Sequence, residues 1–428
     1  MRRSEPRRSR LGARSPLIAG IVVALVLGGL LTGFHHTARL LVPPRTAINA
    51  ALHGPQTRQA LTGVHWNRVA VTPIDNQLEH VSFLSHGKLV AEAAVDRAGT
   101  VVSEKADRMP VPYGNWVAYE PAVLAGLCLL FVLMAGVAPW RRLRNLDVAV
   151  TLSFLPAVLL FQHRYLSASM LAAAPPMAYL LLRCGVVAFG PESQSGAARP
   201  LLTALTPRVD PARRVRWLRW LLVALIGVFL MVAVGSPDAV DVLFAAMEGA
   251  TKLIHGVLPY GHLPPGVIHG DTYPILSYVL YVPLALFAPV NSTWDSVTGG
   301  LVLAVIAALI AAGAVFLTVA GRRRPGSRRP TEVEEAGLRA ALAWLAFPPL
   351  LITVSTGTTD PALAAMLAIA VLVWRRPVLC SGVLAVAGWF KLAPFVLVPV
   401  VLAPLRGRRL AGALGAIVVV SLPLVALL

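Results

Sequence analysis

The sequence has few charged residues for its length. Asp, Glu, Lys and Arg together make up 14% of 428 residues, whereas soluble domains carry about 25%. Hydrophobic residues make up 57%, and the mean hydropathy is +0.70. A soluble fold would expose much of this apolar surface to water, which costs free energy. The composition therefore excludes an ordinary soluble protein and predicts an integral membrane protein.

Lysine and cysteine are also scarce. Arg, Ala, Gly and Pro abound, which is typical of GC-rich bacterial genomes, so we expect an actinobacterial source. The only lysines are Lys88, Lys105, Lys252 and Lys391. The three cysteines, all inside apolar runs, are Cys128, Cys184 and Cys380. They match no metal-ligand spacing and no disulfide framework, and we expect them to be small buried side chains.

Acidic residues are outnumbered by basic ones, 20 against 38, which gives a formal net charge of +18. Nucleic-acid binding is not indicated, because the basic residues fall in short clusters between apolar spans, the positive-inside pattern of membrane proteins. We expect a multi-pass protein of the bacterial plasma membrane with a cytoplasmic N-terminus. The clusters expected on the cytoplasmic side are 1–15, 141–144, 208–219, 322–329, 375–376 and 406–409.

The apolar spans predict an all-α transmembrane fold of about 10–12 helices. Residues 16–34 are long enough to cross about 30 Å of hydrocarbon, and no A-x-A cleavage site follows them, so we expect an uncleaved anchor. The later spans are 121–139, 146–162, 169–189, 218–235, 273–290, 300–320, 337–355, 361–374, 378–404 and 410–427. The chain divides into 1–34, 35–118, 119–235, 236–272 and 273–428.

Two spans are ambiguous. If 273–290 crosses the membrane, the basic residues 322–329 fall outside, against the charge rule. Either 273–290 is re-entrant or interfacial, or the basic loop breaks the rule. Prolines interrupt 378–404, which is either one kinked helix or two short helices that meet near Lys391.

Residues 35–118 form the one sizeable polar region. Alternating segments separated by turn signals predict a small β-rich extracytoplasmic domain with one meander. No catalytic constellation is found in it, so we expect a structural or regulatory role. The predicted strands are His65–Val71, His80–Leu84, Lys88–Val95 and Thr100–Glu104.

Polar chemistry concentrates in residues 236–272, directly after an apolar span. Apolar positions at helical spacing predict an amphipathic helix from Asp238 to Ile254, and we expect its acidic stripe to face an aqueous cavity. Asp241 and Glu248 lie two turns apart on that stripe, and Glu248 can pair with Lys252. Further candidates near the next span are Tyr260, His269, Asp271 and Tyr273.

Two later polar residues complete the candidate site. Asp360 precedes Pro361 and fits the role of a helix N-cap. Lys391 lies far from both ends of its apolar span, where a cation costs about 3 kcal/mol or more. It must therefore face a partner or a cavity, and a phosphate would suit it. Snorkelling to the membrane surface is the alternative.

Three signatures carry a resemblance to a known family. The first combines an acid with a glycine-tyrosine turn, Asp241…Gly249…Gly256…Pro259-Tyr260. The second is Tyr273-Pro274…Ser277-Tyr278…Pro283. The third is Pro348-Pro349…Gly357-Thr358-Thr359-Asp360 followed by Lys391…Pro394. Over about 236–428 the chain resembles the bacterial polyprenol-phosphate-dependent mannosyltransferases, glycosyltransferase family 87 of the GT-C class.

The resemblance implies a GT-C-like enzyme that moves a hexose, mannose-like, from a polyprenyl-phosphate donor to a cell-envelope glycan or glycolipid, with inversion. It implies that Asp241 is the essential acidic residue and that Lys391 lies near the donor phosphate. We expect Asp241 to act as general base and His269 to bind the donor phosphate together with Lys391. Glu248 and Asp271 would position the acceptor or a divalent cation, and Asp238 is a further candidate. The sequence requires no cofactor. The family's acid normally follows the first span. Here four spans and a β-rich loop precede the equivalent span, 218–235, so either two N-terminal modules have been added or the resemblance is to a divergent branch.

Two other function classes are compatible with the pattern. A transporter or flippase of lipid-linked material would place ionisable residues mid-membrane in several helices, whereas here the acids cluster at one face. A non-catalytic membrane protein would use residues 35–118 as a sensing domain.

Overall fold

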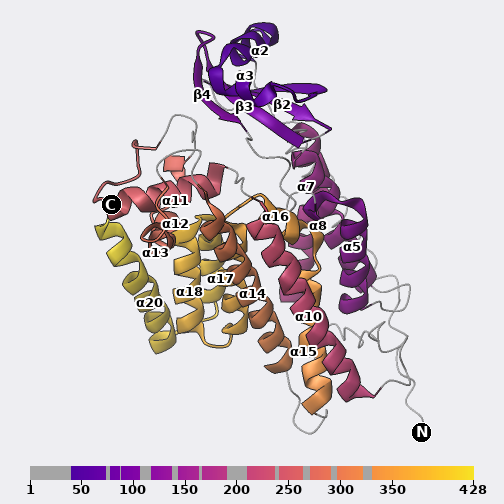
Figure 1. The fold of residues 1–428 in the computed structure, drawn as a ribbon. Coiled ribbons are helices and arrows are strands. Elements are labelled where there is room, and N and C mark those ends of the chain that lie inside the picture. Colours follow the sequence, from indigo (N-terminus) through magenta and orange to yellow (C-terminus); the bar gives the residue numbers. More distant parts are fainter. Residues whose placement is uncertain are drawn as a thin grey trace, which may run out of the picture. The chain divides into compact units, whose positions relative to one another are not determined.

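The computed structural model describes residues 40–73, 78–86, 88–106, 117–136, 143–162, 166–189, 210–236, 241–263, 270–290, 296–321 and 330–428. The described chain is mostly helical and has one small sheet (Figure 1). It divides into two compact units, residues 1–39 with 137–199 and residues 40–136 with 200–428. The predicted anchor at 16–34 lies outside the described residues.

The polar N-terminal region contains an antiparallel meander of four strands in the order β1-β2-β3-β4, as predicted. Two short helices that the sequence did not predict, α2 (Pro44–His53) and α3 (Pro55–Leu61), precede the sheet. Ala47 and Ala51 of α2 share a buried cluster with Val81, Phe83 and Val95 of the sheet. The strands are β1 (Arg68–Pro73), β2 (Leu78–Ser85), β3 (Lys88–Asp96) and β4 (Val101–Ala106).

The first compact unit contains three described helices, α6 (Leu143–Leu152), α7 (Phe154–Gln162) and α8 (Leu166–Phe189). The carboxylate of Asp147 accepts hydrogen bonds from the Tyr179 hydroxyl at 2.8 Å and from Arg183 Nε at 3.0 Å. A carboxylate in a segment apolar enough to cross a membrane costs less free energy when it is paired in this way.

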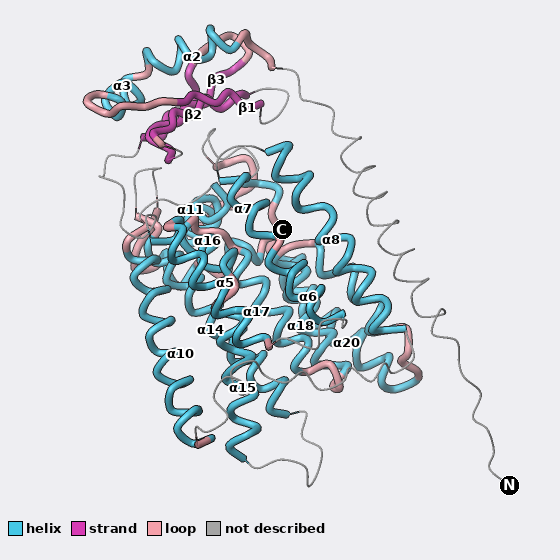
Figure 2. Tube along the Cα trace, turned by 90° about the vertical axis from the view of Figure 1, so that its right-hand side faces the viewer, coloured by secondary structure: helices cyan, strands magenta, loops and turns pink. Residues whose placement is uncertain are grey.

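The helices of the second unit line up side by side (Figure 2). Small residues such as Ala304, Ala308 and Ala312 are buried on α14 and let neighbouring backbones approach closely. The longer helices are α5 (Pro121–Ala135), α10 (Pro211–Val234), α14 (Thr298–Gly321), α15 (Pro330–Leu345), α17 (Asp360–Leu372), α18 (Pro377–Phe390) and α20 (Gly407–Ala426). The shorter ones are α16 (Pro348–Ser355) and α19 (Val398–Leu402).

Four segments among the described residues are long and apolar enough to cross a membrane. A fifth results if α15 and α16, bent by 52° at a short break, form one span. The four are Leu143–Phe161, Pro211–Val234, Thr298–Gly321 and Gly407–Ala426. The multi-pass character is therefore supported, and the predicted number of 10–12 spans stays a prediction.

The ambiguous segment 273–290 contains no continuous helix. It follows the 3-10 turn η1 (Gly270–Thr272) and holds only two four-residue helices, α12 (Leu276–Val279) and α13 (Val282–Ala285). Four helical residues rise about 6 Å, far less than the hydrocarbon thickness. This geometry fits the interfacial or re-entrant alternative and not a regular transmembrane helix.

The other ambiguous segment, 378–404, is divided near Lys391. Helix α18 ends at Phe390, and Lys391 has extended dihedral angles of φ −144° and ψ 133°. The chain continues as a 3-10 helix, η2 (Ala393–Leu397), and then as α19. The structure therefore contains two short elements that meet at Lys391, the second of the two alternatives.

Among the described residues of the second unit, the basic clusters lie at one end of its helices. The first turns of α10 and α15 meet there, where Arg214 Nη2 lies 3.3 Å from Glu335 Oε2 and Arg219 Nε lies 2.9 Å from Glu334 Oε1. From α14 to α20 the chain runs back and forth between the two ends of the helices, with α16 following α15 across a 52° bend (Figure 1). Because 273–290 forms no spanning helix, residues 375–376 and 406–409 join helices at that same end, and Asp360 and Lys391 lie at the opposite end.

Candidate functional site

Helix α11 (Asp241–Ile254) is the first element of the candidate site. We expected its acidic stripe to face an aqueous cavity, and Glu248 and Lys252 of this stripe do line a cavity, although its middle turns are largely buried. Ala245 is fully buried, and Glu248 is only 3% exposed. The reason is the segment 270–290, whose helices α12 and α13 pack against α11. Among the described side chains of the stripe, Lys252 is the most exposed, at 26%.

Close packing holds α11 against α12. A Cβ on residue 249 would overlap the ring of Tyr278, so only glycine fits there. The Tyr278 hydroxyl donates a hydrogen bond to the Gly270 carbonyl oxygen. Tyr278 thereby fixes η1 relative to α11 and α12. As a result, Asp271 of η1 lies beside α11.

Tyr260 and Tyr273 close the loop that follows α11. The Tyr260 hydroxyl donates to the Tyr273 carbonyl oxygen at 3.1 Å, and its ring meets the Tyr278 ring edge to face at 5.8 Å. Burial raises the pKa of the Tyr260 phenol, so it remains protonated and keeps donating. These contacts give the Tyr260 hydroxyl a structural role.

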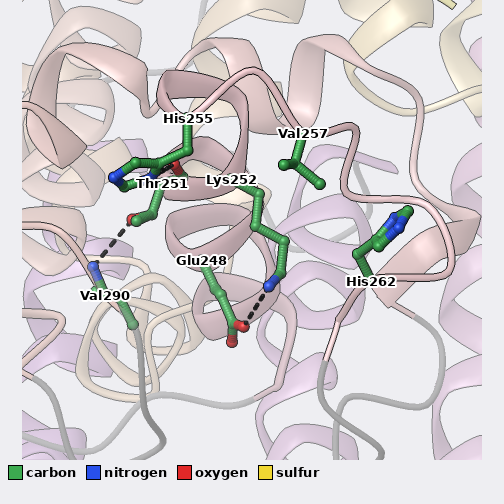
Figure 3. Close-up of a pocket in the computed structure, with 7 residues that line it drawn as sticks. All are labelled: Glu248, Thr251, Lys252, His255, Val257, His262 and Val290. Carbon is green, nitrogen blue, oxygen red and sulfur yellow. Dashed lines mark hydrogen bonds and ion pairs between the residues drawn. The ribbon is translucent and has the colours of Figure 1, made fainter.

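A cavity of about 280 Å³ lies beside α11, lined by Glu248, Thr251, Lys252, His255, Val257, His262 and Val290 (Figure 3). Glu248 Oε1 lies 3.3 Å from Lys252 Nζ, the pair that the spacing predicts. Thr251 Oγ1 accepts the Val290 N–H at 2.9 Å and so ties the far end of 270–290 to α11.

The second part of the site is an ion pair between Lys391 and Asp360, whose Nζ and Oδ1 are in direct contact. Asp360 is the first residue of α17 and makes no capping hydrogen bond, because Thr359 occupies the N-cap position. The expected N-cap role of Asp360 is therefore wrong, and its carboxylate neutralises Lys391 instead. The Lys391 side chain is 24% exposed and the Asp360 side chain 54%.

Lys391 is held in place by its neighbours. The Ser277 hydroxyl of α12 donates to the Phe390 carbonyl oxygen, and Trp389 Nε1 donates to Ser421 Oγ at 2.8 Å. Because the adjacent Tyr278 packs on α11, α12 connects α11 with the Lys391–Asp360 pair. Sequence reasoning missed this role of Ser277, although Ser277-Tyr278 belongs to one of the family signatures.

The structure describes only part of the predicted constellation. Asp238 and His269 lie outside the described residues, as do the side chains of Asp241 and Asp271. Among the side chains that are described, no group of three or more His, Cys, Asp or Glu could hold a metal ion.

Comparison with known proteins gives one match. Residues 272–428 match the family described as Glycosyltransferase family 87. The matched range includes Tyr273, Asp360 and Lys391, whereas α11 with Asp241 and Glu248 precedes it. No curated protein and no solved structure was found to match the chain. The resemblance drawn from the sequence is thus confirmed over 272–428, where this part of the chain is similar to glycosyltransferase family 87.

Proposed function

We propose that the protein transfers a hexose, mannose-like, from a polyprenyl-phosphate donor to an extracytoplasmic glycan or glycolipid acceptor. The observation that carries the proposal is the junction at α12. This short helix binds the Phe390 carbonyl oxygen next to Lys391 through Ser277 and packs on α11 through Tyr278. Lys391, a cation suited to a phosphate, and α11, a helix that carries acidic residues, thereby meet at one end of the helices. This end lies opposite the basic clusters, and the charge rule assigns it to the outside.

The proposed chemistry assigns one task to each part of the site. The acceptor hydroxyl oxygen attacks the anomeric carbon as the bond from that carbon to the phosphate oxygen breaks, so the configuration inverts. Asp241 takes the hydroxyl proton as general base. The polyprenyl phosphate leaves with the bonding electron pair, and Lys391, with His269, stabilises its added negative charge.

The remaining acids support binding. Glu248 and Asp271 position the acceptor. A divalent cation is compatible with these carboxylates, but no step of the proposal requires one. Asp360 keeps the Lys391 ammonium in place until the donor phosphate arrives.

The test is a transfer assay with the purified protein in lipid vesicles. Polyprenyl-phosphate hexose labelled in the sugar is supplied with cell-envelope glycolipids, and a nucleotide-activated hexose serves as the control donor. We expect labelled product of inverted configuration from the lipid donor only. Label that crosses the bilayer without forming a glycosidic bond would support the transporter class instead. No product from either donor would contradict the proposal.

A further inference from the structure

The cavity beside α11 has the lining of a ligand site rather than of a packing gap. It lies between the last two turns of α11 and the loop that follows, and Val257 and His262 at its rim are exposed (Figure 3). Four polar side chains that the proposed chemistry does not use line it, namely Thr251, Lys252, His255 and His262. An apolar gap left by imperfect packing would not gather so many hydrogen-bonding groups.

The charges in the cavity are balanced. The buried Glu248 carboxylate is neutralised by Lys252 at 3.3 Å. An anionic ligand would have to compete with Glu248 for Lys252, and a cationic ligand would have to compete with Lys252 for Glu248. The pair still offers oxygen lone pairs and N–H groups, which suit a neutral polar ligand.

The two histidines add acceptors to this set. His255 Nδ1 lies 2.8 Å from the Thr251 carbonyl oxygen, and His262 Nδ1 lies 2.9 Å from the Tyr260 carbonyl oxygen. A carbonyl oxygen can only accept, so each Nδ1 carries a proton, and in the neutral ring Nε2 is an acceptor. Donors and acceptors are therefore mixed in the cavity lining, which matches hydroxyl groups because each hydroxyl donates and accepts at once.

We propose that this cavity binds a neutral sugar ring of the acceptor, one that is not the ring undergoing reaction. The inference rests on the proposed function, in which Asp241 is the base. Asp241 precedes Glu248 by seven helical residues, about 10 Å along the axis, so a single ring cannot occupy the cavity and present a hydroxyl at Asp241. The acceptor must therefore contain at least two linked sugars or one sugar joined to a further hydroxyl-bearing group.

The test measures binding in the absence of donor. Methyl glycosides of glucose, mannose and galactose, each as monosaccharide and linked disaccharide, are titrated into the purified full-length protein by calorimetry. We expect at least one disaccharide to bind more tightly than its monosaccharide. Glu248→Gln should weaken that binding about tenfold, because it removes the charge from a hydrogen-bond acceptor. His262→Ala should weaken it about fivefold.

His53→Ala is the matched control. His53 is also exposed, and its Nδ1 bonds the Asn49 carbonyl oxygen at 2.7 Å, but it lies on α2. The His53→Ala variant should therefore leave glycoside binding unchanged. His262→Ala removes only an exposed side chain, so it keeps the test decisive if Glu248→Gln fails to fold.

The outcomes separate this inference from the proposed function. If the wild type transfers sugar and both cavity variants leave glycoside binding and acceptor KM unchanged, the cavity assignment is overturned and the proposed function stands. Failure of every glycoside to bind would also overturn the assignment. Binding that depends on Glu248 and His262, without any transfer from the lipid donor, would support the cavity and contradict the proposed function.

Discussion

At the scale of single residues, the pairing with Asp360 explains how the Lys391 cation is tolerated within an apolar region before it binds the proposed donor phosphate. The carboxylate neutralises the ammonium while no donor is bound. Asp360 is more than half exposed, and an exposed ion pair contributes at most about 1 kcal/mol. A donor phosphate can therefore replace Asp360 as the partner of Lys391 at small cost.

We expect Lys391→Met to lower the rate of sugar transfer about a hundredfold, because one charge-stabilising donor is worth about that much in a transition state. Initial rates at saturating acceptor measure the effect. Asp360→Asn should act more weakly and mainly on donor KM. Arg408→Met, an exposed cation on α20 at the opposite end, is the control. A rate for Lys391→Met equal to that of the control would contradict the phosphate assignment.

Thr251 provides a second prediction at this scale. Thr251→Val keeps the shape but removes the acceptor of the buried Val290 N–H, and a buried donor without a partner costs about 1–3 kcal/mol. We expect a lower melting temperature in detergent. Thr318→Val in α14 is the matched control, since that hydroxyl only donates to the Ala314 carbonyl oxygen. Equal shifts for the two variants would show that the Thr251 bond does not stabilise the segment 270–290.

At the scale of elements, the contact between α11 and α12 organises the site. It depends on the absence of a side chain at Gly249, where the Tyr278 ring lies. Displacing α12 would also move Ser277 away from the Phe390 carbonyl oxygen. The two halves of the site are therefore coupled through one four-residue helix.

We expect Gly249→Ala to destabilise the protein by about 1–3 kcal/mol, the usual cost of overpacking, and to lower transfer with it. Thermal unfolding and the transfer rate are the measurements. Gly227→Ala in α10 is the control, because a Cβ there meets no neighbouring atom. Wild-type stability and activity in Gly249→Ala would rule out the proposed coupling.

At the scale of the whole molecule, the short helices of 273–290 reconcile the topology with the charge rule. If this segment does not cross, residues 375–376 and 406–409 lie on one side, and Asp360 and Lys391 on the other. A regular span at 273–290 would reverse the sides of every later element relative to α11.

Cysteine labelling checks this topology. In a background without Cys128, Cys184 and Cys380, we expect Leu258→Cys to react with an impermeant maleimide added outside intact cells. Arg375→Cys should react only after permeabilisation. Both original side chains are exposed. Reaction of the two cysteines from the same side would mean that 273–290 crosses the membrane.

The sequence predicted those features that depend on local pattern. The alternation of β1 to β4 and the helical spacing of α11 were visible because each is set by neighbouring residues. The ion pair of Lys391 with Asp360 and the burial of Glu248 were not visible. Both depend on which elements pack together, and the short helices of 270–290, which cover α11, resemble a span in hydropathy alone.

The central claim is that Asp241 at the start of α11 removes the acceptor proton during sugar transfer. The most direct measurement compares the transfer rate of Asp241→Asn with that of the wild type, using labelled polyprenyl-phosphate hexose. Asp210→Asn, an exposed acid that precedes α10 at the opposite end, is the control. We predict a loss of about a hundredfold or more for Asp241→Asn and none for the control. Undiminished transfer by Asp241→Asn would contradict the claim.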